Sequence, residues 1–99
     1  MENKLEHFVG FQWDQGDIDK NLVKHNVENW ESEQVFFNRP LLVLDAPKHS
    51  IPEKRWAAFS KTDADRFLTV IFTKRGDLIR VISARDMNKK ERKFCNEEG

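Results

Sequence analysis

The sequence is short of the residues from which disulfides, metal sites and membrane helices are built. Its single cysteine, Cys95, cannot form an internal disulfide and has no partner at the spacing of a redox or metal motif. The three histidines, His7, His25 and His49, lack the spacing of a zinc site, and no glycine-rich phosphate loop is present. No stretch approaches the roughly 20 apolar residues of a membrane helix, and the N-terminus has no signal-peptide core. We therefore expect a cytoplasmic protein that needs neither a metal nor a cofactor.

The net charge is zero, yet the charges are unevenly distributed along the chain. Residues 1–50 hold five Lys or Arg and nine Asp or Glu, a net charge of −4, whereas residues 51–99 hold twelve and eight, a net charge of +4. Residues 74–93 carry eight basic side chains against three acidic ones. Such a basic segment on a neutral protein fits local phosphate contacts, although a charge run is also the ordinary composition of a solvated face.

The length and the aromatic content predict one compact domain. Ninety-nine residues bury a single core, and the hydrophobic content of 38% is low, but eight Phe and three Trp compensate because large aromatics bury more area than aliphatic residues. We expect Trp13, Trp30 and Trp56 to lie in this core. Residues 1–7 are expected to form a flexible tail and residues 8–99 the domain.

Capping residues and apolar spacing predict the fold class. Helices are predicted from Asp14 to about His25 and from Asn29, taken as the N-cap, to about Phe37. Strands are predicted at residues 8–13, 41–44, 56–59, 67–73 and 78–84. Asn88 and Glu91 have the spacing of a capping box, so a last helix is predicted over residues 89–97. The class is α+β, with two N-terminal helices, an antiparallel sheet and a C-terminal helix.

The last two strands form a predicted hairpin that exposes an arginine. If Arg75-Gly76 is its two-residue loop, Phe72 pairs with Ile79 on an apolar face. Arg80 then lies on the opposite face, within an otherwise apolar strand. A guanidinium is costly to bury unpaired, so we expect this face to meet a charged partner. A register slip of one residue would exchange the two faces.

Several short motifs occur in a characteristic order along the chain: Phe11–Asp14, Asn21–Val27, His49–Arg55, Thr73–Arg85 and Glu91–Arg92. In these motifs the chain resembles the BrnT family, the toxins of type II toxin–antitoxin pairs. The most specific stretch is Arg75–Arg85, supported by Lys24 and His25. The chain departs from the family pattern at Asn26, which replaces the usual glycine after Lys-His.

The resemblance implies a RelE-like fold and a ribonuclease that arrests translation. It also implies a cognate antitoxin, which neutralises the toxin in a two-plus-two complex and binds operator DNA through a domain of its own. RNA and this antitoxin are therefore the expected partners. No membrane partner is expected.

RNA cleavage without a metal needs three kinds of group. A base takes the proton of the 2′-hydroxyl, an acid protonates the leaving 5′-oxygen, and cations stabilise the charged transition state. Two acid–base pairs are available, His49 with Glu53 or His25 with Lys24, and Arg80 is the candidate that steadies the phosphate. The candidate RNA-binding residues are Arg55, Arg75, Arg85, Lys89 and Lys90. The two lysines lie at the positive end of the predicted last helix, an unfavourable position that an external phosphate would explain.

Each candidate also has an ordinary structural explanation. His25 can compensate a helix dipole, Glu53 and Arg55 can form an ion pair, and Arg85 can bind acidic groups of an antitoxin. Two other functions therefore stay open: a non-catalytic module that binds RNA or protein, and a RelE-like scaffold that has lost activity.

Overall fold

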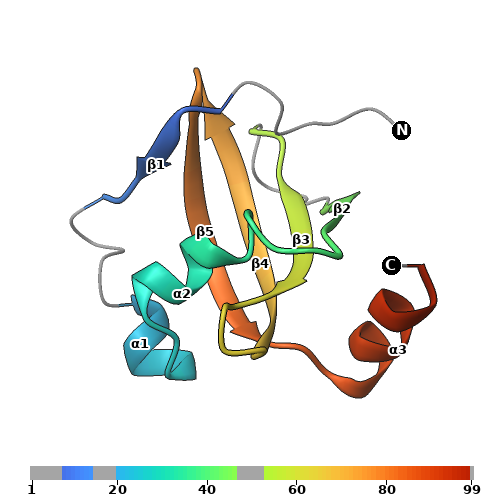
Figure 1. The fold of residues 1–99 in the computed structure, drawn as a ribbon. Helices are drawn as coiled ribbons and strands as arrows, with labels where there is room; N and C mark the ends of the chain where they lie inside the picture. The colour runs from blue at the N-terminus through green and yellow to red at the C-terminus, as the bar shows by residue number, and fades with distance from the viewer. Residues whose placement is uncertain (1–7, 15–19, 47–52, 99) are drawn as a thin grey trace.

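The computed structural model describes residues 8–14, 20–46 and 53–98, which form one sheet and three helices (Figure 1). The strands are β1 (Gly10–Gln12), β2 (Leu42–Asp45), β3 (Trp56–Lys61), β4 (Phe67–Arg75) and β5 (Leu78–Asp86). The helices are α1 (Lys20–His25), α2 (Asn29–Gln34) and α3 (Lys89–Glu98). The predicted α+β class, with two helices before the main strands and one after them, is confirmed. None of these helices is long and apolar enough to cross a membrane.

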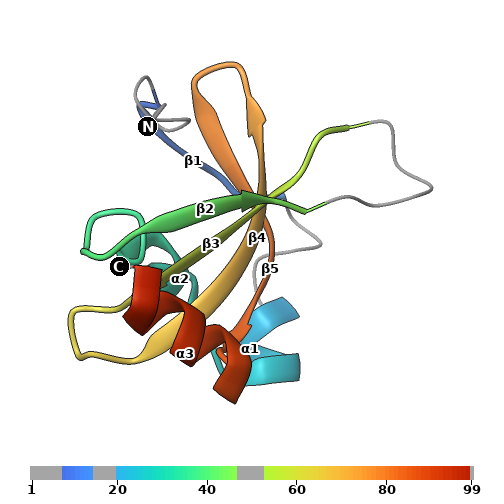
Figure 2. The ribbon, with the colours of Figure 1, turned by 90° about the vertical axis from the view of Figure 1, so that its right-hand side faces the viewer.

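The sheet has the strand order β1-β5-β4-β3-β2. Neighbouring strands are antiparallel, except that the edge strand β1 runs parallel to β5. The two central strands, β4 and β5, are the longest, and their hairpin extends beyond the rest of the sheet (Figure 2). The predicted antiparallel sheet is thus observed with one parallel strand added at its edge.

The two faces of the sheet are covered differently. Alternating residues of β4, including Val70 and Phe72, pack on Val35 and Phe36 after α2 and form the larger core. The other face has a smaller apolar cluster in which Cys95 of α3 packs with residues of β3. Over the described residues, α3 covers only the part of this second face that lies at β3.

The β4–β5 hairpin differs in register from the prediction. Arg75 pairs with Leu78, so the loop is Gly76-Asp77, and Gly76 adopts the left-handed φ of 61° that this turn requires. Phe72 consequently pairs with Val81 instead of Ile79, a shift of two residues. Because side chains alternate with a period of two, this shift leaves the predicted faces unchanged.

Two predictions about α2 are wrong. Glu28 precedes the helix as its N-cap, and its N–H donates to Glu31 Oε1 at 2.9 Å, so Asn29 is the first helical residue and not the cap. Trp30 is 57% exposed and lies outside the core. The helix turns Ser32 and Val35 toward the sheet, which directs position 30 away from it at 100° per residue.

Candidate active site

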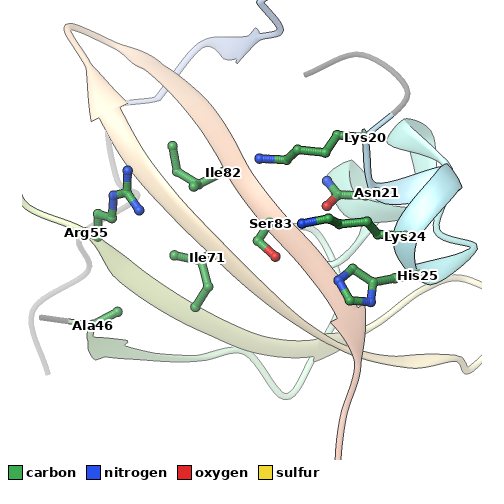
Figure 3. A pocket seen from close by; sticks show the side chains of 9 residues that line it. All are labelled: Lys20, Asn21, Lys24, His25, Ala46, Arg55, Ile71, Ile82 and Ser83. Carbon is green, nitrogen blue, oxygen red and sulfur yellow. The ribbon is translucent and has the colours of Figure 1, made fainter. Parts of the chain in front are cut away.

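One pocket of about 390 Å³ lies between α1 and the second face of the sheet (Figure 3). Its lining combines cationic, apolar and hydroxyl side chains. These are Lys20, Asn21, Lys24, His25, Ala46, Arg55, Ile71, Ile82 and Ser83. A volume of this order suits a small ligand, since such sites are commonly about 300–1,000 Å³.

Helix α1 supplies one wall of the pocket. Lys20 and Lys24 are one helical turn apart and both extend toward the sheet, and His25 follows at the last helical residue (Figure 3). Asn21 is buried, and its Oδ1 accepts a hydrogen bond from the Ala84 N–H of β5 at 3.1 Å. This contact ties α1 to the sheet and thereby directs its cationic face into the pocket.

An irregularity in the sheet shapes the floor of the pocket. Ile71 pairs with Ser83 and Phe72 pairs with Val81, so Ile82 is an extra residue in β5. Such bulges re-aim side chains at functional sites. Here the bulge allows both Ile82 and Ser83 to line the pocket beside Ile71.

Arg55 supplies the opposite wall, just before β3 (Figure 3). Its Nε is buried and has no hydrogen-bond partner among the described residues. A buried donor without an acceptor costs about 1–3 kcal/mol. An anionic ligand in the pocket would supply that acceptor.

The other three predicted arginines are paired with carboxylates of the protein and do not line the pocket. The pairs are Arg80 with Asp14 at 2.8 Å, Arg75 with Glu53 at 3.3 Å, and Arg85 with Glu91 through two bonds of 2.8 Å. A hydrogen bond from Gln12 and the contact with Arg80 hold the pKa of Asp14 below its usual value. The charge that Arg80 carries on the apolar strand is therefore compensated within the protein.

The structure brings together part of the predicted site. Lys24, His25 and Arg55 line one pocket, whereas Glu53 pairs with Arg75 outside its lining. His49 lies outside the described residues. The exposed pair Lys89 and Lys90 starts α3 and is also absent from the lining.

Lys20 was not predicted, although its spacing of four from Lys24 in a helix was a usable signal. The sequence predicted Ile71 and Ile82 only as strand residues, and the structure adds both to the pocket lining. Within the described ranges, no three His, Cys, Asp or Glu side chains gather as metal ligands would.

Comparisons with known proteins agree with this fold. Residues 13–91 match the family described as "Ribonuclease toxin, BrnT, of type II toxin-antitoxin system". A crystal structure of the Brucella abortus ribonuclease toxin, BrnT, superposes with a TM-score of 0.59 at 21% identity, covering 82% of this chain and 99% of that one. No curated protein matches the chain. Because the family match spans most of the sequence, the chain belongs to the BrnT family of type II toxin–antitoxin systems.

Proposed function

We propose that this chain is an endoribonuclease toxin that cleaves RNA by acid–base catalysis in the pocket between α1 and the sheet. The observation that carries the proposal is the convergence of Lys24, His25 and Arg55 on one cavity, with an Arg55 donor that has no acceptor among the described residues. Family membership supports the same reaction class. The pocket is cationic although the chain as a whole is neutral, which fits an anionic ligand of limited size.

The proposed reaction is an internal transesterification of RNA. A base removes the proton of the 2′-hydroxyl, whose oxygen attacks the adjacent phosphorus. The P–O5′ bond breaks, and an acid delivers a proton to the departing 5′-oxygen. The products are a 2′,3′-cyclic phosphate and a 5′-hydroxyl end, so atoms and charges balance without a metal or a cofactor.

The residues of the pocket have suitable chemistry for each step. A neutral imidazole accepts a proton readily, so we assign the role of the base to His25. The Lys24 ammonium is a proton donor next to His25 in the sequence, so we assign the acid to Lys24. The Arg55 guanidinium can hold two phosphate oxygens at once and stabilises the charge that develops in the transition state. The apolar side chains of Ile71 and Ile82 offer a surface for a sugar or base.

Arrest of translation and neutralisation by a cognate antitoxin are further parts of this proposal. Both rest on membership of the family of type II toxins. The expected antitoxin would be encoded beside this chain and would cover or distort the pocket. Its complex with the toxin is expected to contain two copies of each chain.

Cleavage of a fluorescent single-stranded RNA by the purified full chain tests the proposal. We expect cleavage that persists in EDTA and a cyclic phosphate end on the product. Arg55→Gln should lower kcat about 10²–10³-fold, the usual loss when one transition-state donor is removed. Val23→Ala is the matched control, because Val23 is 82% exposed on α1 and does not line the pocket.

Three results would contradict the proposal. These are wild-type protein that binds RNA without cleaving it, cleavage abolished by EDTA, and a folded Arg55→Gln variant with unchanged kcat. The first would identify the non-catalytic binding module instead. Expression in a bacterium gives a parallel readout, since growth should stop with the wild type and continue with folded Arg55→Gln.

A further inference from the structure

We propose that Arg66, which does not line the pocket, is the residue that positions Lys24 and His25 for catalysis. The inference rests on the proposed function and concerns how the wall formed by α1 is held in place. Arg66 lies immediately before β4, and its side chain is 25% exposed. Arg66 is not among the residues that line the pocket, and its contact with His25 is to the backbone carbonyl, so its role is positioning and not catalysis.

The side chain of Arg66 donates hydrogen bonds to three elements of the fold. The first group of these bonds joins Arg66 to the end of β5. Its Nε donates to Asp86 Oδ1 at 2.7 Å, and its Nη2 donates to Asp86 Oδ2 at 3.1 Å. This two-bond arrangement fixes the plane of the guanidinium group. It also holds the pKa of Asp86 below its usual value. The sheet therefore supplies a rigid base for the remaining donors.

The second group of these bonds joins Arg66 to both helices. Nη1 donates to the Asn26 carbonyl at 2.9 Å and to the Glu31 carboxylate at 3.2 Å, and Nη2 donates to the His25 carbonyl at 3.4 Å. The five N–H groups of a guanidinium thus all have acceptors. One side chain connects the end of α1, the first turn of α2 and the end of β5.

The described part of helix α1 spans six residues. Isolated helices shorter than about 12–15 residues are marginal in water, so contacts with the rest of the protein help to hold this segment in place. Asn21 ties its first turn to Ala84, and Arg66 ties its last carbonyls to Asp86. Lys24 and His25 lie between these two tethers, so loss of the second frees the residues that face the ligand.

Lysine cannot replace Arg66 in this geometry. A lysine ammonium keeps the positive charge but has three donors and no planar fork. The structure requires donors that point to β5 and to both helices at the same time. Arg66→Lys therefore separates the charge of the residue from its geometry, and Arg66→Gln removes both.

The experiment compares Arg66→Lys, Arg66→Gln and the control Glu91→Gln in the full chain. Glu91→Gln breaks another two-bond arginine–carboxylate pair, between Glu91 and Arg85, which holds α3 and not α1. Cleavage of single-stranded RNA gives kcat and KM, and urea unfolding shows which variants are folded at the assay temperature.

We expect kcat to fall about a hundredfold in both Arg66 variants, the loss typical of a catalytic group displaced by about 1 Å. KM should change less than about threefold, because Arg66 does not line the pocket. Glu91→Gln should lose a similar fraction of stability and keep kcat within about twofold. Equal kcat losses in all folded variants, or full activity in Arg66→Lys, would overturn the proposal.

Amide hydrogen exchange tests the same inference without activity. The Asn26 and Val27 amides donate to α1 carbonyls at 3.0 and 3.1 Å. In folded Arg66→Gln they should exchange at least tenfold faster than in the wild type, and in Glu91→Gln they should not. Unchanged exchange would contradict the positioning role even if the wild type were active. A wild type with no ribonuclease activity would instead refute the proposed function, and faster exchange in that case would still support the tether.

Discussion

Arg55 and Arg80 carry the same guanidinium group in different electrostatic surroundings. Arg80 is 17% exposed and bonded to Asp14, whereas the buried Nε of Arg55 has no acceptor in the described part of the chain. A guanidinium that already pairs with a carboxylate of the protein binds a phosphate more weakly, because the phosphate must compete with that carboxylate. At the scale of single residues, the partner of each arginine is therefore a better guide to the site than its place in a strand.

The two arginines should respond differently to substitution. Arg80→Gln leaves Asp14 without its main cationic partner and should lower the free energy of unfolding only slightly, because exposed ion pairs contribute little to stability. Its kcat for RNA cleavage should fall less than about tenfold, well short of the loss in Arg55→Gln. Urea unfolding and steady-state kinetics measure the two effects. Equal losses of kcat in Arg80→Gln and Arg55→Gln would instead indicate that Arg80 contacts the phosphate, as the sequence predicted.

Helix α3 is attached to the sheet by the Glu91 carboxylate in addition to the apolar contacts of Cys95. Glu91 accepts two bonds from Arg85, one from the Thr69 hydroxyl and one from the Asn88 N–H. The bonds from Arg85 contribute most to lowering the pKa of Glu91 from 4.5 to about 2. The cap of α3 and its attachment to the sheet thus share one side chain.

This lowered pKa makes part of the stability dependent on pH. The contribution of Glu91 is fully present above about pH 4.5 and is lost as the pH falls toward 2, because the unfolded chain takes up the proton first. Glu91→Gln should lower the free energy of unfolding by roughly 1–3 kcal/mol at pH 7, allowing for solvent screening at the half-exposed Arg85. Urea unfolding at several pH values measures this difference, which should shrink between pH 4.5 and 2. A difference that is constant with pH would contradict the argument.

For the whole molecule, the zero net charge limits how RNA can be attracted. The cations that the structure concentrates in the pocket are Lys20, Lys24 and Arg55. Four other arginines pair with carboxylates, namely Arg66, Arg75, Arg80 and Arg85. Long-range attraction should therefore be weak, and binding should depend on a few close phosphate contacts.

The salt dependence of RNA binding tests whether only a few cations contact phosphates. With about three phosphates neutralised, the logarithm of the RNA association constant should fall with the logarithm of salt at a slope of about −2, since single strands give about −0.7 per contact. Fluorescence anisotropy with a short labelled RNA measures the slope. A slope steeper than about −4 would show that further cations bind the strand. Lys89→Gln with Lys90→Gln would then reveal whether the predicted lysines of α3 are among them.

The helices, strands and local caps follow from short-range sequence features. Asn88 and Glu91 form the predicted capping box at 2.8 and 3.0 Å. Asn26 follows α1 at a positive φ of 57°, a conformation that asparagine tolerates better than most residues. The faces of the hairpin were also predictable, because apolar alternation determines the face even when the register is wrong by two. These features depend on neighbours a few residues apart, which the sequence displays directly.

The partners of the charged residues depended on the tertiary structure. Asp14 and Arg80 are 66 residues apart, and Arg66 reaches across 40 residues to the Asn26 carbonyl. Nothing in the spacing of these residues indicates that they meet. The sequence by itself determined which segments form helices and strands, because propensity is local. It also determined that Lys24, His25 and Arg55 are available as catalytic groups, because side-chain chemistry is local. Only the folded chain decided which cations face the pocket and which face carboxylates, because an ion pair depends on distance in space and not on distance along the chain.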